Sequence, residues 1–243
     1  MPLLALTAAS AGADAICYLR LGHVFPANMT GNTVLLGIGI ARGDYAAAAR
    51  SGCALGGFVL GAAAAAAAPD RPGRASAGRV VLLAELATLV TFAAWWLAAG
   101  TAAGAIRAGL IILAGLAMGL QSGTVARLHI PGVSTTYITG TWTALSTWIG
   151  ASLRRDDTAP GADHSRAPAR ALQVAVLTCY VGVAVVSGYL SRGLGAGAAA
   201  APAVALLIAV GTVFGSDPQA GRESGRPSGG NRSASGSDPD LHR

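Results

Sequence analysis

The chain has 243 residues, of which 53% are hydrophobic and only 12% are charged, and its mean hydropathy is +0.54. This composition is too apolar for the polar surface of a soluble domain, so it excludes an ordinary water-soluble fold. The formal net charge is +6, but all 17 basic residues are arginines that lie mostly between apolar blocks. Such placement is typical of a membrane topology signal and argues against a nucleic-acid partner.

The first half of the chain contains three long apolar blocks and one short one. The long blocks cover residues 3–22, 46–68 and 79–99, and the short one covers 29–42. A helix needs about 20 apolar residues to cross the hydrocarbon core, and the short block would cover only ~21 Å. The N-terminal block has the apolarity of a signal peptide but lacks a basic n-region, so we expect it to be the first span.

The second half repeats this order of long, short, long and long blocks. They cover residues 104–126, 137–152, 169–191 and 198–214. We therefore expect a transmembrane domain over residues 1–214, with one repeat over about 3–99 and another over about 104–214. Residues 215–243 are rich in Gly, Ser, Asp, Pro and Arg, and this composition predicts a disordered cytoplasmic tail.

Polar residues recur in the same order in both halves. In each, a polar residue in the first block is followed six positions later by Arg-Leu, and a Thr-Gly pair then opens the short block. The positions are Asp14, Arg20 and Thr30-Gly31 in the first half, and Gln121, Arg127 and Thr139-Gly140 in the second. The order predicts an internal repeat, although an Ala- and Gly-rich composition can also produce such matches by chance.

Arginine placement distinguishes two topologies. If the short blocks cross the membrane, the loop with Arg71, Arg74 and Arg79 falls opposite the other arginine-rich regions. If they are re-entrant or half-helices, these regions all fall on one side, which the positive-inside rule favours. We therefore expect an all-α polytopic membrane protein with about six full spans and two short helices. Three spans in each half make the repeats inverted and place both termini in the cytoplasm, as in many secondary transporters.

Glycines recur at four-residue spacing in two of the long blocks. They are Gly52, Gly56, Gly57, Gly61, Gly115, Gly119 and Gly123. Small residues at this spacing let two helix backbones approach closely, so we interpret them as packing positions.

Several of these motifs resemble the YoaK-like family of bacterial membrane proteins. The resemblance covers about residues 8–214 and rests on Gly-Ala-Asp-Ala at 12–15, Val-Phe-Pro-Ala-Asn-Met-Thr-Gly-Asn at 24–32, Gly-Leu-Gln at 119–121 and Thr-Thr-Tyr-Ile-Thr-Gly at 135–140. It implies a multi-pass inner-membrane protein of unknown function and implies no substrate. Ser122 departs from the Asn that the family tends to carry after this Gln.

The two Thr-Gly pairs suggest a binding site. A helix that begins inside the membrane exposes N–H groups and the positive end of its dipole, which attract anions. Thr30 and Thr139 are suitable N-cap residues, and the neighbouring glycines permit close approach. The candidate substrate-binding residues are Asp14, Arg20, Asn28, Thr30, Gly31, Asn32, Gln121, Arg127, Thr139 and Gly140. The alternative is that Thr and Gly only cap and pack the two helices.

Two acidic residues lie within apolar blocks. An ionisable group in a span needs a partner, a bound ion or access to water. Asp14 is wrongly spaced to pair with Arg20 along one helix face, so we expect Arg127, a proton or a cation as its partner. For Glu85 we expect the side chain to snorkel to the cytoplasmic surface near Arg79.

We expect a small-solute transporter for an anionic or polar solute, with the lipid bilayer as its surroundings. A membrane enzyme or a lipid-associated scaffold is the alternative. No GxxxxGK[ST], HExxH or GxSxG motif is present, so we expect no catalytic residue and no cofactor. His23 and His129 precede the two short blocks but supply too few ligands for a metal site. Homo-oligomerisation stays open.

Overall fold

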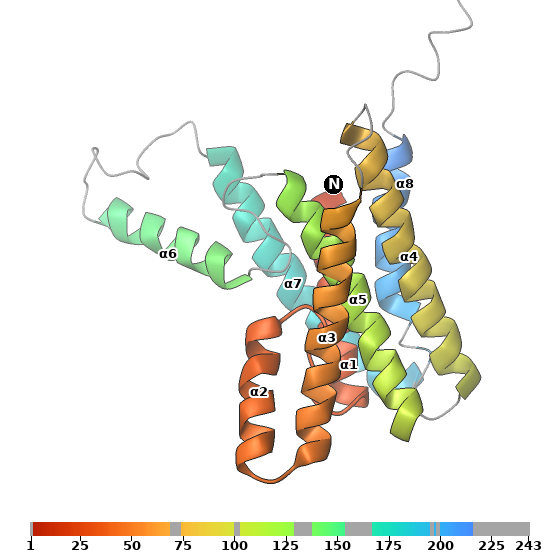
Figure 1. Ribbon diagram of the computed structural model, residues 1–243. Coiled ribbons are helices and arrows are strands. Elements are labelled where there is room, and N and C mark those ends of the chain that lie inside the picture. Colours follow the sequence, from red (N-terminus) through yellow and green to blue (C-terminus); the bar gives the residue numbers. More distant parts are fainter. Residues whose placement is uncertain are drawn as a thin grey trace, which may run out of the picture.

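The computed structural model describes residues 2–68, 74–99, 103–128, 138–153, 167–194, 197 and 200–215. Within these residues all regular secondary structure is helical and there is no strand (Figure 1). Its helices are α1 (Pro2–Arg20), α2 (Met29–Ala41), α3 (Tyr45–Ala67), α4 (Arg74–Ala99), α5 (Gly104–Leu128), α6 (Ile138–Leu153), α7 (Ala167–Leu194) and α8 (Ala200–Gly215). The expected all-α polytopic class is confirmed. The predicted tail lies outside the described residues from position 216 onward.

Five of the described helices are long and apolar enough to cross a membrane. Their spans are Leu3–Arg20, Tyr45–Ala67, Gly78–Ala99, Gly104–Ala126 and Pro168–Gly193. The sixth predicted span corresponds to α8, whose 16 residues cover about 24 Å, less than the ~30 Å hydrocarbon core. The predicted short blocks correspond to α2, with 13 residues, and α6, with 16.

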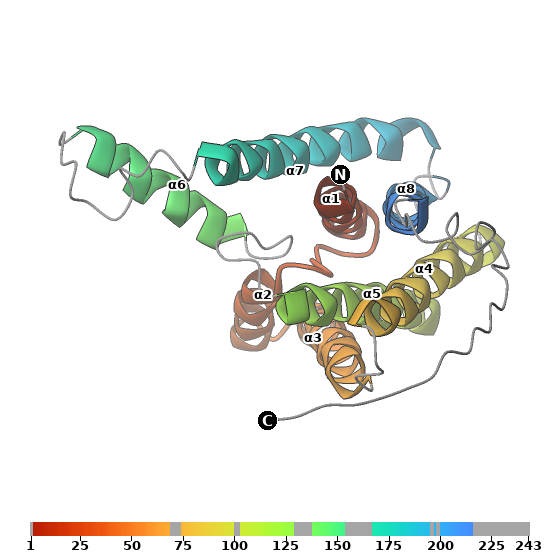
Figure 2. The same cartoon turned by 90° about the horizontal axis from the view of Figure 1, so that it is seen from above.

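The helices pack in a pattern that pairs the two halves. α3 packs against α5, and α7 packs against α1. In the same way α4 packs against α5 and α8 against α1, while α2 lies on α3 and α6 on α7 (Figures 1 and 2). If each helix of α1–α4 is exchanged for its counterpart in α5–α8, the same pairs of neighbouring helices therefore result.

Two buried apolar clusters, one toward each end of α1, show how the helices run. The first core cluster contains Leu6, Ala9, Ala13, Ala27, Leu82, Leu89, Ala117, Met118, Val125, Leu206 and Val210. The second core cluster contains Ile16, Cys17, Leu21, Val24, Ala54, Phe92, Trp96, Leu110, Ile111 and Ala114. The beginning of α1 thus lies with the end of α5, and the end of α1 lies with the beginning of α5. α1 and α5 therefore run in opposite directions.

The loop after α1 folds back toward the middle of the bundle. Gly22 and His23 turn the chain with φ of 98° and 63°, and Arg50 Nε donates to Gly22 O at 3.2 Å. The loop then brings the Ala27 N–H to within 2.7 Å of Asp14 Oδ1, six residues before the end of α1. α2 consequently starts ~9 Å inside the end of α1 and lies beside the N-terminal part of α3 (Figure 1).

The α3–α5 interface brings two helix backbones into direct contact. A Cβ added at Gly57 or Gly61 would collide with the carbonyl oxygens of Ile112 and Leu116. From the other side, a Cβ at Gly115 would lie 2.6 Å from Ala54 O. These glycines fulfil the packing role predicted from their spacing, as do Gly119 and Gly123. Gly52 and Gly56 do not, because an added Cβ at either one meets nothing within 4 Å.

Candidate functional site

The Asp14 carboxylate links three segments of the chain inside the bundle. Asp14 is only 4% exposed, and its Oδ1 accepts the Ala27 N–H at 2.7 Å. Its Oδ2 accepts the Tyr180 hydroxyl of α7, also at 2.7 Å. Both partners are neutral donors, which suit an ionised carboxylate because that group can only accept hydrogen bonds. Asp14 therefore joins α1, the loop before α2, and a helix of the other half.

Asparagines, not threonines, organise the beginning of α2. The N-cap is Asn28, whose Oδ1 accepts the Gly31 N–H at 3.1 Å. The buried Asn32 side chain accepts the Phe25 N–H at 3.0 Å and donates to Phe25 O at 2.6 Å, which fixes the returning loop. The prediction that Thr30 caps the helix is wrong: Asn28 takes that place because the helix already begins at Met29, and Thr30 lies exposed in its first turn.

Gly31 permits close packing within this loop. An added Cβ would lie 3.2 Å from both the Phe25 ring and the Asn28 amide. The first turn of α2 is therefore closely covered by its own loop. The sequence predicts that an anion is attracted to this helix start. The protein itself supplies one, because the Asp14 carboxylate accepts the N–H of Ala27, two residues before Met29.

The matching residues of the second half are arranged differently. Thr139 and Gly140 are exposed in the first turn of α6, and no hydrogen bond between described residues joins them to the start of α2. Thr141, at the place equivalent to Asn32, is 1% exposed. The loop before α6 and the Arg127 side chain lie outside the described residues, so the expected Asp14–Arg127 pairing stays a prediction.

Gln121 connects the two halves at the position equivalent to Asp14. Its side chain is fully buried, and Nε2 donates to Ser10 Oγ at 2.8 Å and to Leu6 O at 3.1 Å. Both acceptors belong to α1. Gln121 therefore lies at the α1–α5 contact, whereas Asp14 faces α7. Arg20 lies further along, exposed at the end of α1.

Glu85 is buried in the core. It is 0% exposed, and neither carboxylate oxygen has a hydrogen-bond partner among the described residues. It lies between Leu82 and Leu89 on the face of α4 that belongs to the first core cluster. The expected snorkelling of Glu85 to the surface is therefore wrong, since its one-turn spacing from those leucines turns the side chain inward.

Tyr180 is the partner that the sequence analysis missed. It comes from the other half of the chain, and spacing within one sequence does not reveal which helix faces Asp14. The available signal was a phenol in the middle of an apolar span, because a buried Tyr hydroxyl usually has a hydrogen-bond partner.

Comparison with known proteins gives the family. Residues 3–212 match the family described as Protein of unknown function (DUF1275). Over 147 residues the chain is 39% identical to the UPF0700 transmembrane protein YoaK of Bacillus subtilis (strain 168), a match that covers 59% of this chain and 64% of that protein. No solved structure matches the chain. The apolar helices and the transmembrane relative show a multi-pass membrane protein, and the chain belongs to the YoaK-like family of unknown function, DUF1275.

Proposed function

We propose that the chain is a small-solute transporter built from two inverted repeats, with its solute path beside Asp14 at the α1–α7 interface. The observation that carries the proposal is the Asp14 carboxylate, buried within a span and bonded to Ala27 and Tyr180. Ionisable groups are costly inside a membrane and commonly mark pathways for ions and solutes.

The helix arrangement supports the inverted repeat. The neighbours of α1–α4 correspond to those of α5–α8, and the matching helices α1 and α5 run in opposite directions. In addition, α2 begins at the depth of Asp14, as expected for a half-helix of such a transporter. Both termini then lie on one side of the membrane, and the arginine distribution supports our proposal that this side is the cytoplasm of a bacterial inner membrane.

A proton or a cation at Asp14 would couple binding to helix movement. Protonation turns one carboxylate oxygen into a donor, which no longer accepts equally from Ala27 N–H and Tyr180 O–H. Each hydrogen bond to a charged group contributes about 1.5–3 kcal/mol, so losing one changes the populations of two arrangements about tenfold or more. The link between α1 and α7 would therefore loosen when Asp14 is neutralised.

The same geometry indicates the class of solute. An anionic solute, as the sequence suggested, would have to share the start of α2 with the Asp14 carboxylate. A neutral polar or cationic group would instead be attracted by it. We therefore propose a polar or cationic solute, with a proton or cation as the coupling ion.

Sidedness tests the inverted topology. Single cysteines replacing Arg42, Ala105, Ala67 and Pro168, all exposed, are introduced into a variant that lacks the native cysteines. An impermeant thiol reagent on intact cells should label the first two and not the last two, because α2 does not cross in our proposal. Labelling at Ala67→Cys with protection at Arg42→Cys, Ala105→Cys and Pro168→Cys would instead mean that α2 and α6 both cross.

Electrical recording on proteoliposomes tests transport. We apply jumps in pH, in Na⁺ concentration, or in the concentration of one compound from a panel of amines and neutral amino acids. At least one of these jumps should produce a saturating current. Asp14→Asn should abolish the ion-coupled current, whereas Asp44→Asn should keep it, because Asp44 is an exposed N-cap that Asn can replace. No current in the wild type at any jump, with an altered lipid product or partner complex in cells, would favour the enzyme or scaffold alternative.

A further inference from the structure

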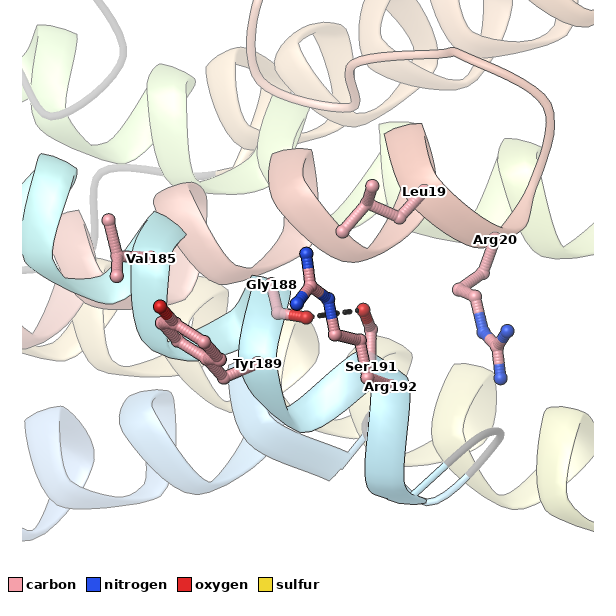
Figure 3. A pocket seen from close by; sticks show the side chains of 7 residues that line it. All are labelled: Leu19, Arg20, Val185, Gly188, Tyr189, Ser191 and Arg192. Atoms are coloured by element: carbon pink, nitrogen blue, oxygen red, sulfur yellow. Dashed lines mark hydrogen bonds between the residues drawn. The ribbon is translucent and has the colours of Figure 1, made fainter.

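A pocket lies where α1 and α7 end, beyond the Asp14 site. It has a volume of about 480 Å³. Its lining residues, shown in Figure 3, are Leu19, Arg20, Val185, Gly188, Tyr189, Ser191 and Arg192. Arg20 is six residues, or ~9 Å of helical rise, from Asp14, so the pocket lies nearer the end of the bundle than the Asp14 carboxylate.

Two guanidinium groups dominate the chemistry of this pocket. Arg20 extends from the end of α1, while Arg192 folds back along α7 toward Gly188 (Figure 3). Arg192 Cζ lies 5.6 Å from the centre of the Tyr189 ring, a cation–π contact. Neither arginine forms an ion pair with a described acidic residue. In Figure 3 the two guanidinium groups point apart, so a shared anion requires the long Arg20 side chain to turn toward α7. Two positive charges on neighbouring helices without an acidic partner within the described chain would both gain from such an anion.

The Ser191 hydroxyl in the pocket is already satisfied. The Ser191 hydroxyl donates to Gly188 O at 2.7 Å. Its proton is therefore engaged with the backbone of α7. The charged donors of the pocket are the two arginines, and the Tyr189 hydroxyl is a further, neutral donor. An oxyanion of the phosphate type fits such donors, because guanidinium groups bind its oxygens in a planar, two-point geometry.

Apolar surface adjoins the two charges. Leu19, Val185 and Tyr189 line the pocket and are 51%, 52% and 68% exposed, and Val181, one turn earlier on α7, is 57% exposed. The spans Leu3–Arg20 and Pro168–Gly193 both end at this level. The pocket thus lies where a hydrocarbon-facing helix surface meets the headgroup region.

We propose that this pocket binds the phosphodiester headgroup of an anionic phospholipid between Arg20 and Arg192, with its acyl chains along the exposed face of α7. A soluble phosphate would satisfy the arginines but leave the adjoining apolar side chains unused. Basic pockets between membrane helices are suited to anionic headgroups, because the surrounding hydrocarbon holds the lipid while the arginines bind its charge. The lipid would contact both α1 and α7 at one end.

Lipid binding to the full chain tests this directly. The purified protein in neutral detergent is mixed with phosphatidylglycerol or phosphatidylcholine, and bound lipid is counted by native mass spectrometry alongside the unfolding midpoint. We expect preferential retention of phosphatidylglycerol, weakened about fivefold by Arg20→Gln or by Arg192→Gln and about twenty-five-fold by both together. Arg42→Gln, an exposed arginine outside the pocket, should leave retention unchanged.

Three outcomes would overturn the proposal. They are equal retention of both lipids by the wild type, unchanged phosphatidylglycerol binding in the double variant, and displacement of the lipid by millimolar inorganic phosphate with equal stabilisation. The last result would assign the pocket to a soluble phosphate. If the double variant does not fold, the two single variants still decide, because each is expected to weaken binding while its unfolding midpoint without lipid stays near the wild-type value.

Discussion

The α3–α5 and α1–α7 interfaces each join one helix from each half and correspond to one another when the halves are exchanged, but they have opposite chemistry. Between α3 and α5 the backbones touch, and a Cβ at Gly119 would collide with Phe58 O. Between α1 and α7, a Cβ at the matching Gly12 would lie 3.5 Å or more from any neighbour, which is ordinary contact distance. There the interface holds the hydrogen bond between Asp14 and Tyr180 instead.

This difference indicates where the molecule can move. Backbone-to-backbone packing tolerates no change of spacing, because any shift loses many contacts at once. The polar interface depends on a few hydrogen bonds whose strength varies with the charge of Asp14. In our proposal, one packing scheme used twice yields a rigid helix pair, α3–α5, and a helix pair, α1–α7, whose spacing changes with the charge of Asp14.

The largest expected effect comes from adding one methyl group to the rigid pair. Gly119→Ala places a Cβ against Phe58 O, and because backbone cannot move aside cheaply we expect a loss of about 3 kcal/mol or more in unfolding free energy. The measurement is the unfolding midpoint in detergent, with the fraction of monodisperse protein.

Two matched glycines serve as controls for that change. Gly12→Ala is the equivalent substitution in α1, and Gly52→Ala lies on α3 with nothing within 4 Å of its Cβ. Both should stay close to the wild-type midpoint. Equal losses at positions 12 and 119 would remove the contrast between the two interfaces.

Asp14→Ala should have the next largest effect. It leaves the Ala27 N–H and the Tyr180 hydroxyl without their acceptor, so we expect the unfolding free energy to fall by about 2–3 kcal/mol. Thermal unfolding in the same detergent measures it. A wild-type midpoint in this variant would show that the carboxylate does not join α1 to α7.

Tyr180→Phe should cost less, because it removes one of the two hydrogen bonds at Asp14. We expect the unfolding free energy to fall by about 1–2 kcal/mol. In the double variant with Asp14→Ala, the unfolding free energy should fall by less than the sum of the two single losses. A double-mutant cycle gives the coupling energy. Strict additivity would contradict a direct bond between the two side chains.

Glu85→Leu should change stability in the opposite direction and least of all. The buried carboxyl group has no hydrogen-bond partner among the described residues, so replacing it with an apolar side chain should raise the unfolding free energy by about 1 kcal/mol. Leu89→Ala in the same helix is the control for lost packing. If Glu85→Leu lowers the unfolding free energy as much as Leu89→Ala does, this carboxylate has a stabilising role.

The sequence predicted the helices well because their signals are local. Block lengths gave α1 to α8 nearly at their observed bounds, and glycine spacing predicted the close approach of α3 and α5. It could not tell that Gly52 and Gly56 face outward, since spacing along a helix does not state which face a partner covers. The N-cap was misplaced because Asn28 and Thr30 are both good caps two residues apart.

The site was predictable only in part. Asp14 was identified by its charge in an apolar span, but its partners required the fold. Ala27 reaches it through a returning loop, and Tyr180 reaches it from a helix 166 residues away. Glu85 carries the same kind of sequence signal, but its carboxylate oxygens face the first core cluster without a hydrogen-bond partner among the described residues, which only packing could show.

Distances between spin labels test the central claim most directly. In a variant without Cys17, Cys53 and Cys179, one pair of labels replaces the exposed Leu19 and Val186 across α1–α7. A second pair replaces Leu60 and Ile112 across α3–α5. In liposomes, adding Asp14→Asn should broaden or shift the α1–α7 distance distribution and leave the α3–α5 distribution narrow and unchanged. An unchanged α1–α7 distribution, or equal shifts in both pairs, would contradict the account.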